Sequence, residues 1–506
     1  MTYFNLDSAG YNIMTKKTIN IIGSGFAGLS AAASLAKMGY GVKVFEKNAM
    51  PGGRARKLEE QGYRFDMGPT WYWMPDVFEK FFNRFGYAVS DMYNLKRVSP
   101  GYRMFFGVQD YLDVPADMEE LYQTFENIEK GSAARLKIFL DKAEYKYNIG
   151  INKIVYLPGN SFSELIRWDF IKGVFKLDFF KSVTSYVHSE FKDPRLRQIL
   201  EFPVIFLGAT PNNTPALYTL MNYADLKLGT WYPVGGMYSV VEAMKKVAEE
   251  QGAEFILEAN VDKILTDNNL TTGLSVNGKD HFSDAVVGAA DYHHVEQHLL
   301  PESLRRYNEN YWNKRVMAPS SLLFYLGINK KLTGLLHHNL FFDEDFGNHA
   351  DEIYENPKWP SNPAIYVSCN TVTDPGVAPA GHDNLIVLIP VAPGLEDTEA
   401  IREHYYKMII HRLEKITKQS IGEHVVYKKS YAHNDFINDY NSFKGNAYGL
   451  ANTLLQTAIL KPKMRNPKLK NLFYTGQLTV PGPGVPPTII SGQVVASEID
   501  KYFRRS

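Results

Sequence analysis

The sequence predicts an α/β protein in which a discontinuous Rossmann-like domain encloses an inserted α+β domain. Three observations support this fold class. The chain opens with a βαβ pattern: a β-branched run at 18–22, an Ala-rich helix at 30–38 and a second strand at 41–46. Short apolar runs typical of buried strands recur much later, at 285–289 and 471–475. Between these runs, helical and strand patterns are mixed with aromatic-rich stretches.

The remaining elements follow from the same periodicities. Residues 76–150 are expected to contain alternating helical and irregular stretches. Residues 481–487 are rich in Pro and Gly and are expected to form a tight ordered loop. Further helices are predicted at 162–200, 234–250, 397–415 and 492–502, and strands within 254–265 and at 320–328 and 384–390. We assign residues 14–100, 226–300 and 465–506 to the Rossmann-like domain, and 101–225 and 301–464 to the inserted domain.

Composition excludes several classes of protein. The 506 residues are 45% apolar and 22% charged, which excludes disordered, collagen-like and coiled-coil chains. Lys+Arg and Asp+Glu both number 55, so no global field attracts nucleic acid, and no nucleic-acid partner is expected. With Cys369 as the single cysteine, there is neither a disulfide nor a cysteine-based metal site. The adjacent histidines of 293–294 and 337–338 point in different directions, so no metal site is predicted.

The aromatic content and the apolar runs bear on ligands and membranes. Aromatic residues reach 13%, which indicates either a large aromatic core or an apolar binding cavity. No run reaches the ~18 apolar residues of a spanning helix. Residues 170–181 interleave Phe with Lys, a pattern that fits an interfacial helix and equally a core-packed helix with a solvated face. The first 13 residues resemble no signal peptide, and Met14 is an alternative start.

A dinucleotide fingerprint follows the first strand. Gly23, Gly25 and Gly28 form G-x-G-x-x-G between strand and helix. In this context the glycines allow a tight turn, a close approach to a pyrophosphate and close helix–strand packing, and the helix N-terminus favours the phosphates. Glu46, at the end of the second strand, can accept hydrogen bonds from ribose hydroxyls. The alternative is a glycine-rich turn beside a surface glutamate.

A second glycine block favours a flavin over a nicotinamide. The run 51–54 reads Pro-Gly-Gly-Arg, and Arg54 can pair with pyrophosphate oxygens or, alternatively, form a surface salt bridge. The turn at 66–70 can run beside a flavin ring. Near the C-terminus, Gly476 follows a strand, and the proline-rich loop leads into a helix N-terminus, which forms a second site for an anion or a polar ring edge.

Together these residues resemble the bacterial-type phytoene desaturase family, the FAD-dependent carotenoid desaturases and isomerases of the flavin amine-oxidase-like fold. The resemblance covers almost the whole chain from Met14 and is greatest to phytoene desaturases of Bacteroidetes. Val480 and Pro487 depart from it, because many members have His and Gly there. The resemblance implies FAD as the cofactor, with these residues binding it: Gly23, Ser24, Gly25, Ala27, Gly28, Glu46, Lys47, Gly53, Arg54, Gly68, Pro69, Thr70, Val261, Gly476, Gly484, Val485 and Pro486.

The implied activity is oxidation of CH–CH bonds in a long polyene, in the first place phytoene to lycopene. Alternatives are a carotenoid 3,4-desaturase, a C30 dehydrosqualene desaturase, a flavin amine oxidase, and a non-catalytic FAD-binding partner. At about 0.8 kcal/mol per CH₂, such a carotenoid substrate is confined to membranes. We therefore expect a cytoplasmic protein that associates peripherally with the inner membrane, and a quinone or O₂ as electron acceptor.

Catalytic residues are predicted from one pair of charges. Glu164 and Arg167 lie three apart on a predicted helix, and their spacing resembles an acidic/basic pair of the family. Glu164 would accept the substrate proton, and Arg167 would keep the Glu164 carboxylate ionised until then. The alternative is an i,i+3 surface ion pair.

Overall fold

The computed structural model describes residues 16–161, 181–205, 210–453 and 456–505. Its centre is a five-stranded sheet in the order β19-β13-β1-β2-β9, with every neighbouring pair parallel. The sheet brings distant parts of the chain together, because Ile19 pairs with both Val42 and Ala285. Its strands are β1 (Thr18–Ile22), β2 (Gly41–Phe45), β9 (Ala253–Ile256), β13 (Ala285–Gly288) and β19 (Leu472–Tyr474).

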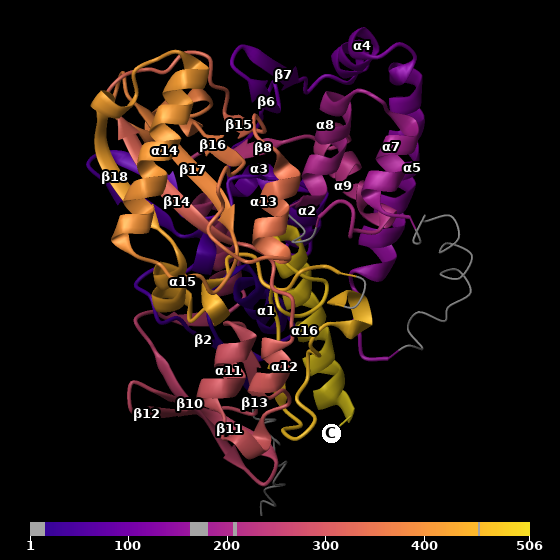
Figure 1. Cartoon of the computed structure of the whole chain (residues 1–506). Helices are drawn as coiled ribbons and strands as arrows, with labels where there is room; N and C mark the ends of the chain where they lie inside the picture. Colours follow the sequence, from indigo (N-terminus) through magenta and orange to yellow (C-terminus); the bar gives the residue numbers. More distant parts are fainter. Residues whose placement is uncertain (1–15, 162–180, 206–209, 454–455, 506) are drawn as a thin grey trace, which may run out of the picture.

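Two helices pack against α1 (Phe26–Lys37) in the middle of the molecule (Figure 1). They are α10 (Tyr238–Glu250) and α16 (Val485–Arg505). Helix α1 has mostly small side chains, because five alanines and two serines are buried along it. Helix α16 can therefore cross it closely. At the crossing, Ser30 Oγ donates to the Ile489 carbonyl at 2.7 Å, and a Cβ on Gly492 would overlap the Ala27 carbonyl.

A three-stranded antiparallel sheet lies at the lower end of the molecule in Figure 1. It consists of β10 (Val261–Asp267), β11 (Leu270–Val276) and β12 (Lys279–Phe282). Its inner residues share an apolar cluster with helices α11 (Tyr292–Leu299) and α12 (Glu309–Asn313). This cluster continues into the main sheet through the buried side chains of Phe45 and Tyr474.

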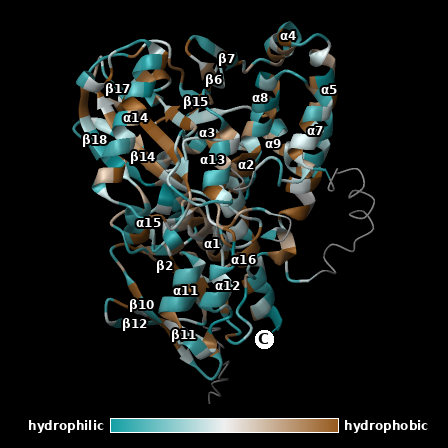
Figure 2. Cartoon of the chain, in the orientation of Figure 1, coloured by the Kyte–Doolittle hydropathy of each residue, from teal (hydrophilic) through white to brown (hydrophobic). Residues whose placement is uncertain are grey.

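The upper part of the molecule contains a seven-stranded sheet in the order β18-β14-β17-β16-β15-β6-β7. Neighbours are antiparallel except β15 and β6. Strand β14 is buried throughout and β17 almost throughout, and both are brown in Figure 2. The elements are β6 (Tyr102–Gly107), β7 (Asp110–Val114), β14 (Ser320–Ile328), β15 (His338–Phe341), β16 (Ile365–Ser368), β17 (Asp383–Val391) and β18 (Val425–Tyr431), with helices α13 (Phe346–Tyr354), α14 (Glu399–Thr417) and α15 (His433–Tyr440).

A group of helices lies beside this sheet, with α4, α5, α7 and α8 on the right of Figure 1 and α2 and α3 nearer its middle. It comprises α2 (Pro75–Asn83), α3 (Val89–Met92), α4 (Met118–Ile128), α5 (Ser132–Ile149), α7 (Val183–Glu190), α8 (Pro194–Ile205) and α9 (Leu220–Asn222). Two short ribbons connect the parts: β3 (Lys57–Glu60) with β4 (Tyr63–Asp66), and β5 (Leu95–Arg97) with β8 (Trp231–Pro233). Among the described residues, no helix combines the length and the apolar character needed to cross a membrane.

Several predicted boundaries were wrong for identifiable reasons. Helix α16 begins at Val485, seven residues before the predicted 492, because prolines are tolerated in a first helical turn, where no N–H partner is needed. Helix α10 begins only at Tyr238, since Gly235 and Gly236 have φ of +88° and +90°. Of the helix predicted at 162–200, residues 162–180 lie outside the described part, and the remainder is divided between α7 and α8.

The prediction for 76–150 was also incomplete. It did not include strand β5 or the hairpin of β6 and β7, which forms one edge of the seven-stranded sheet. Two of these strands pair with distant parts of the chain: Arg97 of β5 lies opposite Trp231, and Arg103 of β6 lies opposite Asn339. Local periodicity contains no signal for such a partner.

Candidate functional site

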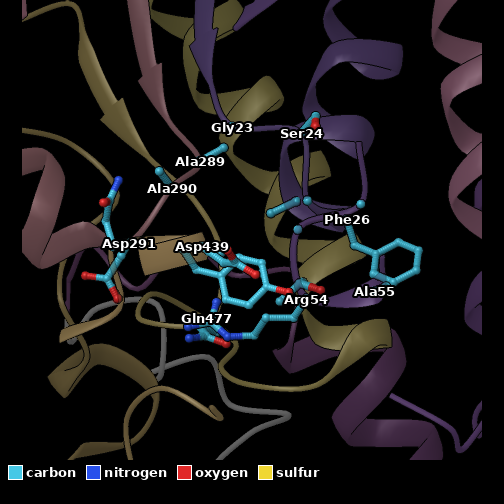
Figure 3. Close-up of a pocket in the computed structure, with 18 of the residues that line it drawn as sticks. Gly23, Ser24, Phe26, Arg54, Ala55, Ala289, Ala290, Asp291, Asp439 and Gln477 are labelled. Carbon is cyan, nitrogen blue, oxygen red and sulfur yellow. The ribbon is translucent and has the colours of Figure 1, made fainter. Parts of the chain in front are cut away.

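A cavity opens at the carboxyl ends of β1, β2 and β13 and extends to the inner face of the seven-stranded sheet (Figure 3). Crevices at the carboxyl ends of parallel strands are where α/β proteins bind ligands. The lining comes from four parts of the chain: 22–69, 259–299, 321–388 and 436–488. The last part provides helix α15, the loop after it and the start of α16.

The first glycine block forms the turn between β1 and α1. Gly23 has a φ of +97°, and its N–H donates to the Phe45 carbonyl at 2.8 Å. A Cβ on Gly28 would overlap the Gly23 carbonyl, so Gly28 serves packing and lies behind the cavity wall. A Cβ on Gly25 would meet no protein atom within 4 Å. Gly25 also begins α1 without a side-chain cap, so the first N–H groups of that helix are available to a ligand.

Glu46 is fixed at the end of β2 and is only 4% exposed. Its Oε2 accepts hydrogen bonds from Ser24 N at 2.9 Å and Ser24 Oγ at 2.7 Å. Its Oε1 accepts from Asn48 N and Nδ2, both at 3.0 Å. The carboxylate is therefore held by four donors while it lines the cavity. It is not an exposed surface group, which was the alternative.

Arg54 and Asp291 line the cavity from different parts of the chain, and both lie below the glycine turn in the view of Figure 3. Its Nη2 donates to Ser442 Oγ at 2.9 Å and to the Asn446 carbonyl at 3.1 Å. Its Nε is buried without a hydrogen-bond partner. Within the described part of the chain Arg54 forms no ion pair, which excludes the surface salt bridge there. Burial lowers the pKa of Arg54 and raises the pKa of Asp291, and the attraction between the two charges opposes both shifts.

Most of the other residues predicted to bind the cofactor line the same cavity. These are Gly23, Ser24, Ala27, Lys47, Gly53, Gly68, Pro69, Val261, Gly476, Gly484 and Val485. Three do not: Gly28, Thr70, whose hydroxyl is bonded to Tyr366 at 2.7 Å, and Pro486 in the first turn of α16. Lys47 Nζ is directed toward the end of α15, where it donates to the Asn438 carbonyl at 2.6 Å. Burial lowers its pKa.

Sequence reasoning missed the wall that faces Arg54. The residues with functional side chains there are Asp291, His294, Asp439, Tyr440, Tyr448 and Gln477. The ring of Tyr440 lies 5.3 Å from the Arg54 guanidinium. Asp291 follows closely on the strand predicted at 285–289, which was the one usable signal. The other side chains follow no glycine or strand pattern.

Beyond Thr70 the chain enters an aromatic cluster. Trp71 stacks on His338 with ring centroids 4.0 Å apart and also contacts Trp73, Tyr102 and Phe202. His338 Nδ1 bonds the Tyr366 hydroxyl at 2.7 Å, and burial keeps the pKa of His338 well below its ordinary value. Among the described residues, no group of three or more His, Cys, Asp or Glu could hold a metal. Glu164 and Arg167 lie outside the described residues.

Comparison with known proteins identifies the family. Residues 26–500 match the family described as "Flavin containing amine oxidoreductase". The chain is 39% identical over 487 residues to a carotenoid 3,4-desaturase of Haloarcula japonica, covering 96% of this chain and 98% of the relative. The chain belongs to the flavin-containing amine oxidoreductase family.

Within that family it groups with the carotenoid desaturases. It is 31% identical over 491 residues to a zeta-carotene-forming phytoene desaturase of Myxococcus xanthus, covering 96% of this chain and 94% of that one. The fold is shared with an oxidoreductase of Methanosarcina mazei, with a TM-score of 0.64 at 17% identity over 95% of this chain and 100% of the other. The predicted family, fold class and flavin-dependent oxidoreductase activity are thereby confirmed.

The cavity fits a flavin nucleotide. The space at Gly25 admits a group that any side chain there would displace, and Arg54 Nε lacks a partner of the kind that a phosphate oxygen supplies. Two helix N-termini, those of α1 and α16, also border the cavity. Positive partial charge at both ends of the cavity suits a diphosphate and an electron-rich ring edge.

Proposed function

We propose that this protein uses FAD to introduce double bonds stepwise into a long apolar polyene, with phytoene as substrate and lycopene or a near relative as product. The observation that carries the proposal is the junction of two environments. The cavity contains a glycine turn, a fixed carboxylate and a buried arginine that forms no ion pair with any described residue. At Thr70 it is followed by a cluster of large aromatic side chains. A flavin and a hydrocarbon need these two environments side by side.

The residues of the cavity divide the binding of FAD among them. The Gly23–Gly28 turn and Arg54 would hold the diphosphate, and Glu46 the ribose of the adenosine half. Val261, at the start of β10, lies where a base would stack between the main sheet and the small sheet. Gly68, Pro69 and the N-terminus of α16 would border the flavin ring. When bound, the flavin supplies the acceptor for hydride.

The protein itself must then orient the substrate, exclude water from the site and provide an acceptor for the proton. Trp71, Tyr102 and Phe202 form one aromatic cluster with ring centroids within 6 Å of one another. We propose that this cluster keeps water away from the ring site. We propose Glu164 as the proton acceptor and Arg167 as the group that keeps it ionised. A proton that leaves carbon in such surroundings needs a nearby base, because apolar side chains cannot accept it.

A second candidate substrate is favoured by one observation. The relative at 39% identity bears the name of a carotenoid 3,4-desaturase, whereas the phytoene desaturase cited above is 31% identical. We keep C30 desaturation as a further alternative, because relatives named diapophytoene desaturases are 29–30% identical. Either substrate would be drawn from a membrane, with a quinone or O₂ as final acceptor.

One experiment separates these substrates. The purified protein with FAD is incubated with liposomes that contain either phytoene, a lycopene-type carotenoid or a C30 analogue, and the pigments are separated. Conversion of phytoene to coloured products supports the proposal. Reaction of the lycopene-type carotenoid alone assigns 3,4-desaturation instead. If no polyene reacts while FAD is bound and a primary amine is oxidised, the desaturase proposal is wrong.

A further inference from the structure

A second hollow on the molecule, distinct from the flavin cavity, collects positive charge. We call it the basic groove. It has a volume of about 330 Å³, room for about ten water molecules at roughly 30 Å³ each. It lies between the segment that follows α11 and the segment that precedes β19. Its lining residues are Asn160, Arg306, Lys463, Arg465, Asn466, Pro467 and Lys470.

The charge of the groove is unbalanced although the chain as a whole is neutral. Residues 463–470 contain four Lys or Arg and no Asp or Glu. Within the described residues, Arg306, Arg465 and Lys470 form no ion pair. Among the described residues, the nearby carboxylates form no ion pair with the charges of the groove. Glu296 is buried and accepts from the backbone N–H groups of Arg306 and Tyr307, so it attracts the Arg306 charge only in part, and Glu498 is bonded to Asn160 and Lys501.

The two arginines are held in place by neutral groups. Arg306 Nη1 donates to the Arg465 carbonyl at 2.9 Å, and Arg465 Nε donates to the Lys470 carbonyl at 2.9 Å. The Arg465 guanidinium also lies 4.9 Å from the ring of Tyr502 and 5.6 Å from that of Phe473. Backbone carbonyls and rings orient a guanidinium without cancelling its charge, so the remaining N–H donors stay available to an anion. Planar, pre-oriented guanidinium groups are the side chains best suited to phosphate.

We infer that the basic groove binds the phosphate of an anionic lipid headgroup and thereby holds the enzyme against a membrane that contains its substrate. The choice of lipid over free phosphate rests on the proposed function, since a polyene must be taken from a membrane. The excess of positive charge in the groove does not depend on the proposed desaturase function. The groove adds a polar contact to the apolar one predicted for residues 170–181.

The test uses the full chain with FAD bound, and vesicles of phosphatidylcholine with and without phosphatidylglycerol. The variant is Arg465→Gln with Lys470→Gln, and the matched control is Lys279→Gln with Lys314→Gln. Both pairs remove two charges from side chains on exposed positions, and the control residues lie outside the groove. Sedimentation measures vesicle binding, and melting temperature and flavin content report whether the fold is intact.

We expect the wild type to bind phosphatidylglycerol vesicles more tightly than phosphatidylcholine ones, and added salt to weaken this binding. The groove variant should lose about 25-fold in partitioning, which corresponds to about 2 kcal/mol for two charges near an anionic surface. The control should lose much less.

Two results would overturn the inference. One is equal binding of the groove variant and the control to anionic vesicles. The other is saturable binding of inorganic phosphate that the variant loses, with no preference for anionic vesicles, since this would assign the groove to a soluble phosphate compound. Desaturation of detergent-dispersed polyene is measured in parallel, so that a failure of membrane binding remains distinguishable from a failure of the proposed function.

Discussion

Substitution by alanine should affect different properties at Gly25 and at Gly28: FAD binding at Gly25 and the stability of the fold at Gly28. A methyl group at Gly25 would enter the cavity, because no protein atom lies within 4 Å of the added Cβ, and φ of −67° suits alanine. A methyl group at Gly28 would overlap the Gly23 carbonyl and lie 3.1 Å from its carbon. Gly25→Ala therefore tests ligand contact, and Gly28→Ala tests packing of the turn.

The expected magnitudes separate the two variants. Without flavin, Gly25→Ala should change the free energy of unfolding by less than about 1 kcal/mol, because a weaker N-cap is offset by a less flexible unfolded chain. With FAD, a methyl group that holds a phosphate away from one N–H donor costs about 1.5–3 kcal/mol, or about 10- to 150-fold in Kd. Gly28→Ala should instead lose about 1–3 kcal/mol of stability in the flavin-free protein.

The assay is flavin titration by fluorescence quenching on deflavinated protein, together with denaturant unfolding of the same samples. The reasoning fails if Gly25→Ala binds FAD as tightly as the wild type. It also fails if both variants lose stability in parallel, because the turn would then serve packing alone and the cavity at Gly25 would have no ligand to admit.

Three further predictions concern other parts of the chain. Burial lowers the pKa of Lys461 from 10.5 to about 7; the unfolded chain therefore binds more protons between pH 7 and 10.5, and the free energy of unfolding should rise with pH across this window. In Lys461→Met this contribution should vanish, as denaturant unfolding at both ends of the window will show. Glu164→Gln should slow flavin bleaching by phytoene about 10²–10⁴-fold with unchanged FAD affinity, and bleaching at the wild-type rate in a single turnover would remove Glu164 from catalysis. Exchanging Phe175 and Phe179 for Asp should reduce liposome flotation while FAD stays bound; unchanged flotation would place residues 170–181 away from the membrane.

Sequence reasoning succeeded where the signal is local. Strands β1 and β14 were predicted to the residue, since apolar runs bounded by turn residues define them. The glycine turn and Glu46 were found because the motif fixes both spacing and chemistry. It failed for the pairing of β6 with β15 and for Asp291 and Tyr440 in the cavity, because these positions depend on contacts between segments hundreds of residues apart. No periodicity encodes such contacts.

The parallel sheet explains why one site is assembled from such distant segments. Strands β1, β13 and β19 are neighbours and parallel, so the turns after all three, at Gly23, Ala289 and Gly476, must meet at one edge. Arg54 is directed into this junction with a buried Nε that no protein group satisfies. Without a ligand, the fold therefore bears the desolvation cost of that guanidinium, which its lowered pKa reflects. A bound diphosphate would remove this cost, and the binding of flavin and the stability of the junction are accordingly linked.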